Sequence, residues 1–248
     1  MYILATDYDG TLNRGGVSQT DRDAIAAFRK SGNRFGIVTG RDCGMYDTLC
    51  HEGVEFDFVI VMNGAMALDS DGSTVFEEVG DASCVRGITE LIGGYDNFLS
   101  CVYRRTRKTF HSAYPKGNDR YRPLCETGEL VSFTMLNTWV SSDELAARAV
   151  AEINERYGRY VHALQNGNCI DIPPCGIDKG VGIARYADML GVPHENIWCA
   201  GDNLNDLAMI SRFHGCAVVN AREEVKAAAE AVRDSIADVI ANIGSAVG

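Results

Sequence analysis

The stretch LATDYDGTLN, residues 4–13, decides the fold, because an apolar strand runs out there into two aspartates, Asp7 and Asp9. The run from Tyr2 to Thr6 is almost continuously apolar, which is typical of a strand covered on both faces in a parallel sheet. Ligands bind beyond the carboxyl ends of such strands, so the two like charges indicate a site.

The alternation of buried strand and helix continues along the first part of the chain. RFGIVTGR (34–41) and FDFVIVMNG (56–64) predict a second and a third buried strand. Between the first two strands, Thr20 can cap a helix that Gly32 ends, because the apolar positions recur at helical spacing. The order is βαβαβ, which favours a parallel sheet covered by helices.

After residue 175 the same alternation returns. The elements expected there are a helix over 178–190, a strand over 196–200, a helix from Leu204, a strand over 216–220 and a helix over 222–231. The predicted fold class is therefore α/β, with a Rossmann-like parallel-sheet core.

The segment in between has a different character, with short alternating runs in which Asp71-Gly72 is a strong hairpin signal. The other elements expected in it are a helix over 82–92, strands around 99–103 and 130–136, and an amphipathic helix opened by Ser141 or Ser142. The sequence thus predicts a catalytic core, residues 1–79 and 176–248, that is interrupted by an α+β cap domain, residues 80–175.

Composition and charge narrow the range of partners. The 248 residues are 46% hydrophobic, enough for a sizeable core, and their formal charge is −11. A nucleic-acid or membrane surface is therefore not expected, and the oligomeric state stays open. One basic stretch of the insert is equally compatible with a solvated face and with a ligand-facing patch. Its members are Arg104, Arg105, Arg107, Lys108, Lys116, Arg120 and Arg122.

The cysteines and the first residues bear on the compartment. Nine cysteines are odd in number, scattered and without a Cys-x-x-Cys pair, so reduced thiols in a cytoplasm are expected. The first residues lack the basic start and the apolar stretch of a signal peptide, and no run approaches the length of a membrane span. We expect a soluble, cytoplasmic protein.

Polar residues follow each of the strands expected in the core. Those residues are Asp7 and Asp9 after the first strand, Thr39, Gly40 and Arg41 after the second, Asn63 and Gly64 after the third, and Asp202 after the strand over 196–200. Any one of them alone is more often a turn or a helix cap. Because the carboxyl ends of parallel strands meet at one edge of a sheet, together they favour a single site.

The acidic residues among them predict a metal site. Asp7 and Asp9 share the same alternation parity, so on a regular strand their side chains leave on the same side. With Asp202 and Asp206 arriving from another strand end, these carboxylates repel, and a positive group is expected among them. Acidic oxygen ligands without His or Cys suit a hard cation, and Mg²⁺ is usual where phosphate is the partner.

Lys179 is a further candidate. It lies in the first turn of the helix expected over 178–190, where a cation opposes the helix dipole. Because this placement is unfavourable for the helix, it indicates a functional role for the lysine. Beside a helix N-terminus it can neutralise a bound phosphate or the Asp7 carboxylate. Taken alone, the residue is more often a solvated surface lysine.

Four motifs together resemble those of the haloacid dehalogenase superfamily, and most fully its Cof-type phosphatases with a large inserted cap. They are DYDGTL (7–12), TGR (39–41), DKG (178–180) and GDNLND (201–206), with MNGA (62–65) and VVNAREEVKAAA (218–229) also similar. The resemblance covers the whole core in order, with the insertion in the expected place. A lone Asp-x-Asp would be weak support, whereas four ordered motifs are specific.

The resemblance implies roles for the two aspartates of the first motif. Asp7 corresponds to the nucleophile that forms an aspartyl-phosphate. Asp9 corresponds to the acid that protonates the leaving alcohol and then activates water. The dehalogenase branch lacks an aspartate at this second position, so phosphoryl transfer is expected in place of carbon–halogen cleavage.

The remaining motifs imply the rest of the site. Thr39 and the Gly40 amide would bind phosphoryl oxygens, Lys179 would screen charge and Asn205 would touch phosphate. The metal residues implied for Mg²⁺ are the Asp7 carboxylate, the Asp9 backbone carbonyl, Asp202 and, in a supporting position, Asp206.

The expected function is a Mg²⁺-dependent phosphatase for small phosphorylated metabolites, with sugar phosphates foremost. Cap residues chosen as candidates for leaving-group contacts are Arg104, Arg105, Arg107 and His111. Two alternatives stay open. A phosphomutase uses the same aspartates, and a phospho-accepting receiver domain also gathers acids, Thr and Lys, although it places its phosphorylated Asp after the third strand, where Asn63 stands here.

Overall fold

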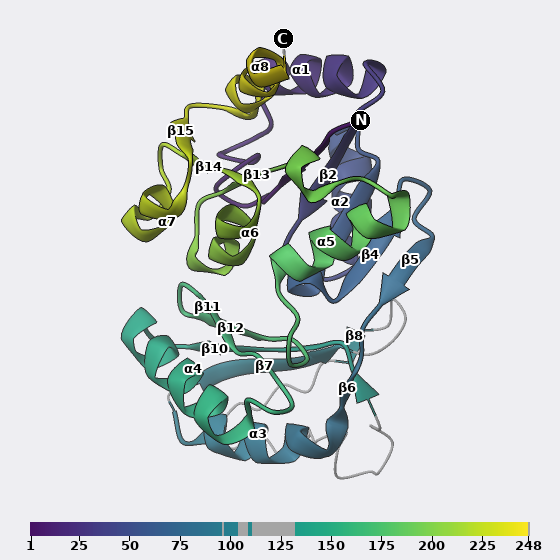
Figure 1. Ribbon diagram of the computed structural model, residues 1–248. Coiled ribbons are helices and arrows are strands. Elements are labelled where there is room, and N and C mark those ends of the chain that lie inside the picture. Colours follow the sequence, from purple (N-terminus) through teal and green to yellow (C-terminus); the bar gives the residue numbers. More distant parts are fainter. Residues whose placement is uncertain (96, 104–108, 111–131, 248) are drawn as a thin grey trace. The chain divides into compact units, whose positions relative to one another are not determined.

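The computed structural model describes residues 1–95, 97–103, 109–110 and 132–247 (Figure 1). They form two compact units, the first made of Met1–Phe76 with Asp178–Gly248 and the second of Glu77–Ile177. Sequence analysis places the junctions a few residues away, at 79/80 and 175/176. The chain thus leaves the first unit once and returns to it.

An eight-stranded sheet in the order β15-β14-β13-β1-β2-β3-β4-β5 forms the centre of the first unit. Its strands are β1 (Ile3–Thr6), β2 (Arg34–Val38), β3 (Phe58–Val61), β4 (Met66–Asp69), β5 (Thr74–Glu77), β13 (Ile197–Gly201), β14 (His214–Val218) and β15 (Ala231–Arg233). The strands from β15 to β3 are parallel, and β4 runs antiparallel to β3. Both neighbours of β1 are parallel to it, so it is central, as its apolar sequence predicts.

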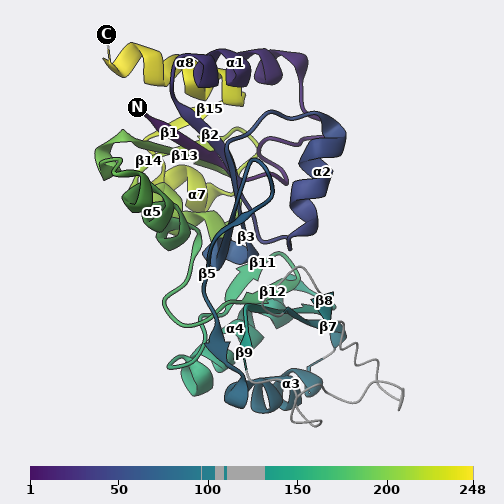
Figure 2. The same cartoon turned by 90° about the vertical axis from the view of Figure 1, so that its right-hand side faces the viewer.

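Helices cover this sheet. They are α1 (Gln19–Lys30), α2 (Gly44–Glu52), α5 (Lys179–Leu190), α6 (Leu207–Arg212), α7 (Glu223–Ala228) and α8 (Ile236–Val247), with short 3-10 turns η1 (Met62–Gly64), η4 (His194–Asn196) and η5 (Leu204–Asp206). Figures 1 and 2 both show α1 and α8 side by side. The prediction of an α/β fold with a Rossmann-like parallel core is confirmed.

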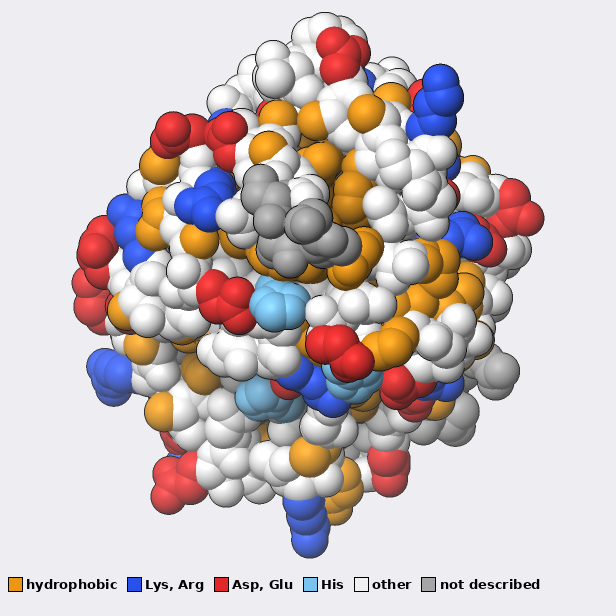
Figure 3. Space-filling model, turned by 45° about the horizontal axis from the view of Figure 1, so that its top comes forward, with side chains coloured by type: hydrophobic (Ala, Val, Ile, Leu, Met, Phe, Trp, Pro, Cys, Tyr) orange, Lys and Arg blue, Asp and Glu red, His pale blue; other side chains and the backbone are white. Residues whose placement is uncertain are grey.

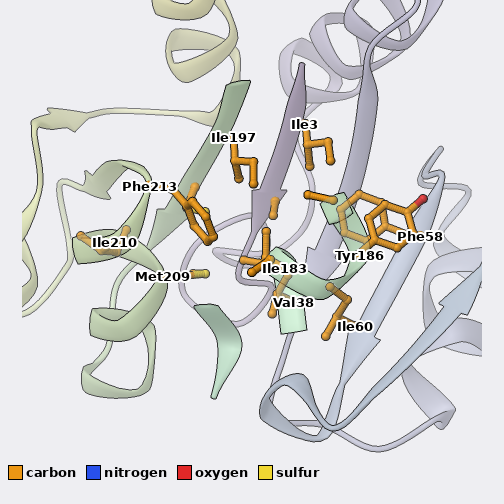
Figure 4. Packing of buried hydrophobic residues seen from close by; sticks show 14 of the residues in the cluster. Ile3, Val38, Phe58, Ile60, Ile183, Tyr186, Ile197, Met209, Ile210 and Phe213 are labelled. Atoms are coloured by element: carbon orange, nitrogen blue, oxygen red, sulfur yellow. The ribbon is translucent and has the colours of Figure 1, made fainter. Parts of the chain in front are cut away.

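Close packing between the sheet and two helices holds the first unit together (Figure 4). Ile3 of β1 and Ile197 of β13 belong to the same buried cluster as Ile183 of α5 and Met209 of α6. Burying an aliphatic side chain of this size contributes about 1.5–3 kcal/mol. The cluster therefore fixes α5 and α6 against the strands whose ends carry the candidate residues.

The second unit has an α+β architecture, also as predicted. Its elements are β6 (Gly80–Asp81), η2 (Ala82–Cys84), α3 (Val85–Gly93), β7 (Asn97–Tyr103), β8 (Thr109–Phe110), β9 (Ser132–Phe133), β10 (Met135–Val140), α4 (Asp143–Tyr157), β11 (Leu164–Asn166) and β12 (Cys169–Ile172). An antiparallel sheet in the order β11-β12-β10-β7-β8 packs through Leu136 and Ile170 in a cluster with Ile88 of α3 and Ile153 of α4.

Two local predictions are wrong. The cap of α1 is Ser18, whose side chain accepts from the Asp21 amide, and not Thr20. The helix expected over 222–231 ends at Ala228, and Ala231 begins edge strand β15. The reason is a long-range hydrogen bond, since the Glu230 amide donates to the Gly215 carbonyl of β14 and draws the chain into the sheet.

The distribution of charged side chains on the surface and the state of the cysteines agree with the amino-acid composition. On the face in Figure 3, acidic and basic side chains are interspersed among apolar ones. The seven cysteines whose side chains the structure describes are not in disulfide bonds. None of the helices in the described ranges is long and apolar enough to cross a membrane. The expected basic stretch, from Arg104 to Arg122, lies outside the described residues apart from positions 109 and 110.

Candidate active site

The first strand ends in a turn that separates its two aspartates. The Asp7 amide still donates to the Ala200 carbonyl of β13 at 2.8 Å, and its side chain is buried. Beyond it the chain leaves the sheet, because the Asn13 amide donates back to the Tyr8 carbonyl at 2.8 Å. The Asp9 side chain is therefore 54% exposed, and the regular strand on which the parity of Asp7 and Asp9 depends ends at Thr6.

The end of β13 brings in a second pair of carboxylates. The buried Asp206 carboxylate accepts from the amides of Asp202 at 2.9 Å and Asn203 at 3.0 Å, so it caps the turn that follows the strand. The Asp202 carboxylate accepts from the Thr11 hydroxyl at 2.7 Å. Gly10 must stay glycine here, since its φ is +79° and a Cβ would lie 2.4 Å from Asp202 Oδ2.

Lys179 joins the two strand ends. Asp178 caps α5 by accepting from the Val181 amide, and this places Lys179 as the first residue of the helix. Its side chain is 0% exposed, so it is not a solvated surface lysine. The ammonium group donates to Asp7 Oδ1 at 2.7 Å and to Asp206 Oδ1 at 2.5 Å.

The charge balance of this cluster is negative. Burial raises the pKa of the Asp7 carboxyl well above its ordinary value, although Lys179 opposes the shift. Burial also raises the pKa of Asp202, against the hydrogen bond from Thr11. For Lys179, burial disfavours the ammonium form, but Asp206 and Asp7 outweigh it and its pKa is raised. Three carboxyl groups thus lie together, and the one ammonium group hydrogen-bonds two of them, Asp7 and Asp206.

A divalent cation fits this donor set. Oxygen atoms of Asp7, Asp202 and Asp206 all lie within 4.8 Å of one another. The set contains carboxylates only, which are the ligands of hard cations such as Mg²⁺. An added positive charge would also offset the excess of negative charge.

The end of β2 contributes the residues expected to bind phosphate. Thr39 is buried, and its amide donates to the Ile60 carbonyl at 2.9 Å, which holds it beside β3. Gly40 is the next residue and is partly buried. Since β1 and β2 are adjacent and parallel, Thr39 and Asp7 follow neighbouring strands at the same edge of the sheet.

Asn205 is placed by a strained turn after β3. Its amide group donates to Asn63 Oδ1 at 3.2 Å. Met62 and Asn63 have positive φ values of 53° and 50°, which cost energy in residues with a side chain and are often found at functional sites. The Asn63 amide donates to the Thr39 carbonyl at 3.0 Å, so the strained turn is tied to the end of β2.

Sequence reasoning assigned no role to two contacting residues, Thr11 and Arg41. Thr11 binds Asp202, and Arg41 forms an ion pair with the Asp9 carboxylate at 2.6 Å. Both lie inside quoted motifs, so motif membership was the signal that could have found them. The leaving-group candidates Arg104, Arg105, Arg107 and His111 lie outside the described residues.

The geometry defines a class of protein. Carboxylates suited to a hard cation, a buried ammonium group and buried polar residues meet at the carboxyl edge of a parallel sheet. Such an arrangement suits an enzyme that acts on phosphate esters, because phosphoryl transfer depends mainly on positioning and on electrostatic stabilisation.

Comparison with known proteins agrees. The chain belongs to the haloacid dehalogenase-like hydrolase family, which matches residues 4–242. It is 25% identical to the 5-amino-6-(5-phospho-D-ribitylamino)uracil phosphatase YcsE of Bacillus subtilis, over 94% of this chain and 90% of that protein. It is 27% identical to a phosphoglycolate phosphatase of Natronomonas pharaonis, over 94% of this chain and 91% of that protein.

A solved structure extends the likeness to three dimensions. BT1666 of Bacteroides thetaiotaomicron, described among phosphatases of the haloalkanoate (HAD) enzyme superfamily, superimposes with a TM-score of 0.79 at 25% identity, over 98% of this chain and 95% of that one. Family and relatives together make this chain a phosphoric monoester hydrolase.

Proposed function

We propose that the chain is a Mg²⁺-dependent phosphatase that hydrolyses small phosphorylated metabolites through an aspartyl-phosphate on Asp7. The observation that carries this proposal is the surroundings of Asp7. It is a buried carboxylate at a strand end, 2.7 Å from a buried ammonium group and within reach of two further carboxylates that can share a cation with it.

In the first step, an Asp7 oxygen attacks phosphorus and the bond between phosphorus and the ester oxygen breaks. Asp9 donates a proton to the leaving oxygen, which departs as an alcohol. In the second step, Asp9 takes a proton from water and the water oxygen attacks phosphorus. The bond to Asp7 then breaks, which releases inorganic phosphate and restores both aspartates.

The other residues bind and orient. Thr39 and the Gly40 amide hold phosphoryl oxygens, Asn205 contacts phosphate, and Lys179 balances the charge of Asp7 during transfer. Mg²⁺, when bound, supplies positive charge against the phosphate oxygens. The groups that would hold it are the Asp7 and Asp202 carboxylates and the Asp9 carbonyl, with Asp206 in support.

We place the substrates among sugar phosphates and related phosphorylated polyols. The relative YcsE is named for a phosphoribityl substrate, which is a phosphorylated polyol chain. The described cysteines are not in disulfide bonds, which suits a cytoplasmic location, where such metabolites occur.

The first test measures release of p-nitrophenol from p-nitrophenyl phosphate by the purified chain, with Mg²⁺ and then with excess EDTA. We expect turnover that disappears on chelation and returns when Mg²⁺ is added back in excess. Turnover that persists in EDTA would refute the metal requirement, and absence of turnover with Mg²⁺, Mn²⁺ or Co²⁺ would refute the phosphatase assignment.

A further inference from the structure

The Asp9 carboxylate is held by a single guanidinium group. Arg41 Nε donates to Asp9 Oδ2 at 2.7 Å and Nη2 donates to Oδ1 at 2.6 Å, so the contact engages both oxygens. Within the described ranges, Arg41 is the one side chain that hydrogen-bonds this carboxylate. Without it, a side chain that is 54% exposed would be free to change rotamer.

Arg41 is itself fixed at both ends. Its amide donates to the Thr39 hydroxyl at 3.2 Å, and its carbonyl accepts from the Met62 amide at 2.9 Å. Its guanidinium lies 5.1 Å from the centre of the Tyr8 ring, at cation–π distance. Through Arg41, the position of the end of β2 therefore fixes the orientation of the Asp9 carboxylate, together with the loop that carries Asp9.

The buried Tyr8 ring is in turn held in place. Its hydroxyl donates to the Glu52 carboxylate of α2 at 2.6 Å and accepts from the Asn13 side-chain nitrogen Nδ2 at 2.8 Å. The surface against which the guanidinium lies is consequently rigid, and Arg41 connects a fixed aromatic ring to an exposed carboxylate.

A forked contact of this kind leaves part of the carboxylate accessible. An ionised carboxylate has about four lone-pair positions, and a guanidinium that bonds each oxygen once takes about two of them. The remaining positions can exchange a proton with an ester oxygen or a water molecule. The ion pair is thus compatible with proton transfer by Asp9.

We propose that Arg41 is a positioning residue, which acts on both proton transfers by holding the Asp9 carboxylate in one orientation. The inference rests on the proposed function, because it takes Asp9 as the acid and base. An ion pair between two side chains this exposed adds little to stability, so stability alone does not account for this arrangement.

Two aryl esters of similar size separate this role from others. We would measure kcat and kcat/KM of the wild-type and Arg41→Met proteins with p-nitrophenyl phosphate and with phenyl phosphate. Phenolate is the more basic leaving group and depends more on an acid. General acid catalysis is worth about 10²–10⁴-fold, so we expect about a tenfold loss of kcat/KM for phenyl phosphate and less than threefold for the nitrophenyl ester.

The second step gives a different signature. Water attacks the same aspartyl-phosphate whatever the leaving group was, so kcat should fall to a similar value for both esters. As this step slows, p-nitrophenol should appear in an initial burst of about one equivalent per active site. A purely structural defect would lower the number of active sites and would not produce this pattern.

A double-mutant cycle tests whether Arg41 acts through Asp9. In the Asp9→Asn background, Arg41→Met should change kcat/KM by less than twofold for either ester. In the protein that keeps Asp9, the Arg41→Lys variant should recover little of the kcat/KM that Arg41→Met loses. The reason is that an ammonium group cannot bond both carboxylate oxygens in the way a guanidinium group does. Arg22→Met is the matched control, since it removes a guanidinium that bonds the Gly53 carbonyl in the same unit.

Three outcomes would overturn the inference. They are an equal loss of kcat/KM for both esters, a loss that persists in the Asp9→Asn background, and full recovery by lysine, which would indicate direct binding of the phosphate charge. Where turnover by Asp9→Asn is too slow to measure, the ratio of the kcat/KM losses for the two esters tests the inference. Wild-type protein without turnover refutes the proposed function itself, and an active wild type with the outcomes above refutes only the role of Arg41.

Discussion

Replacing Asp7 by asparagine exchanges one oxygen for an amide nitrogen and preserves the size of the side chain. The variant cannot form an aspartyl-phosphate, so we expect turnover of p-nitrophenyl phosphate to fall by about 10⁴-fold or more. Far-UV circular dichroism should stay unchanged, because Asp206 remains as the partner of Lys179. An Asp7→Asn protein that stays active and Mg²⁺-dependent would remove the nucleophile assignment.

The free energy of unfolding of the metal-free protein should depend on pH through the carboxyl groups of the site. Burial raises the pKa of the Asp7 and Asp202 carboxyls above the ordinary value of 3.8. A group with a raised pKa in the folded state contributes its full stability below the unfolded value and loses it as the pH rises through the folded value. The metal-free protein should therefore lose stability from about pH 4 upward on account of these two groups.

Mg²⁺ should reverse this loss. At a concentration 100 times its Kd, a ligand that binds only the folded state stabilises by about 2.7 kcal/mol, or about 5–10 °C in Tm for a chain of this size. We expect a shift of that order at pH 7 by differential scanning fluorimetry, and a smaller one at pH 4.5, where protons compete. Asp202→Asn should weaken the shift, and an unchanged shift in that variant would place the metal elsewhere.

At this scale the structure brings together four of the residues named from the sequence, which are Asp7, Lys179, Asp202 and Asp206. Asp7 and Asp202 could be predicted because each ends an apolar run. The burial of Lys179 could not, since a lysine in a first helical turn is usually solvated. The exposure of the Asp9 side chain could not be predicted, because strand parity holds only while the strand continues, and β1 ends at Thr6.

At the scale of elements, α5 carries Lys179 to the site by packing closely on the turn η1. A Cβ on Gly182 would lie 2.6 Å from the Gly64 Cα and 2.9 Å from its carbonyl oxygen, so the helix can approach only if this residue is glycine. The Cα of Gly64 in turn faces the carbonyl of Asp178, the cap of the helix. Two glycines thus set the distance between Lys179 and the strand ends.

The variant Gly182→Ala should accordingly destabilise the protein by about 1–3 kcal/mol, the usual effect of overpacking. The clash involves backbone atoms, which cannot rotate away. Urea unfolding gives the stability, and the Mg²⁺ shift in Tm reports whether Lys179 has moved. Gly244→Ala in α8 is the control, because nothing lies within 4 Å of its Cβ position and alanine favours a helix by about 0.8–1.0 kcal/mol. Equal behaviour of the two variants would contradict the close approach.

Elements could be predicted from sequence where local signals act alone. The helix after Asp178 and the hairpin at Asp71-Gly72 depend on a cap and a turn, and both are present. The end of α7 depends on a hydrogen bond between Glu230 and Gly215, and no local pattern contains that information.

For the whole molecule, the division into two units predicts separate responses to the metal. The carboxylates that can share a cation all belong to the first unit. Hydrogen exchange measured with and without Mg²⁺ should therefore slow in β1 and β13 and stay unchanged in β10 and β12. Sodium chloride at the same ionic strength controls for salt. Equal slowing in all four strands would mean that the units open together.

The position of β1 in the sheet has a consequence for the biosynthesis of the chain. This strand can pair with β2 once both are made, but its other neighbour, β13, comes almost two hundred residues later in the sequence. At about 5–20 residues per second, the ribosome delivers β13 roughly 10 to 40 seconds after β1. For that interval one edge of the central strand is open to other nascent chains. We therefore expect this edge of β1 to stay unpaired until β13, which ends at Gly201, has been translated.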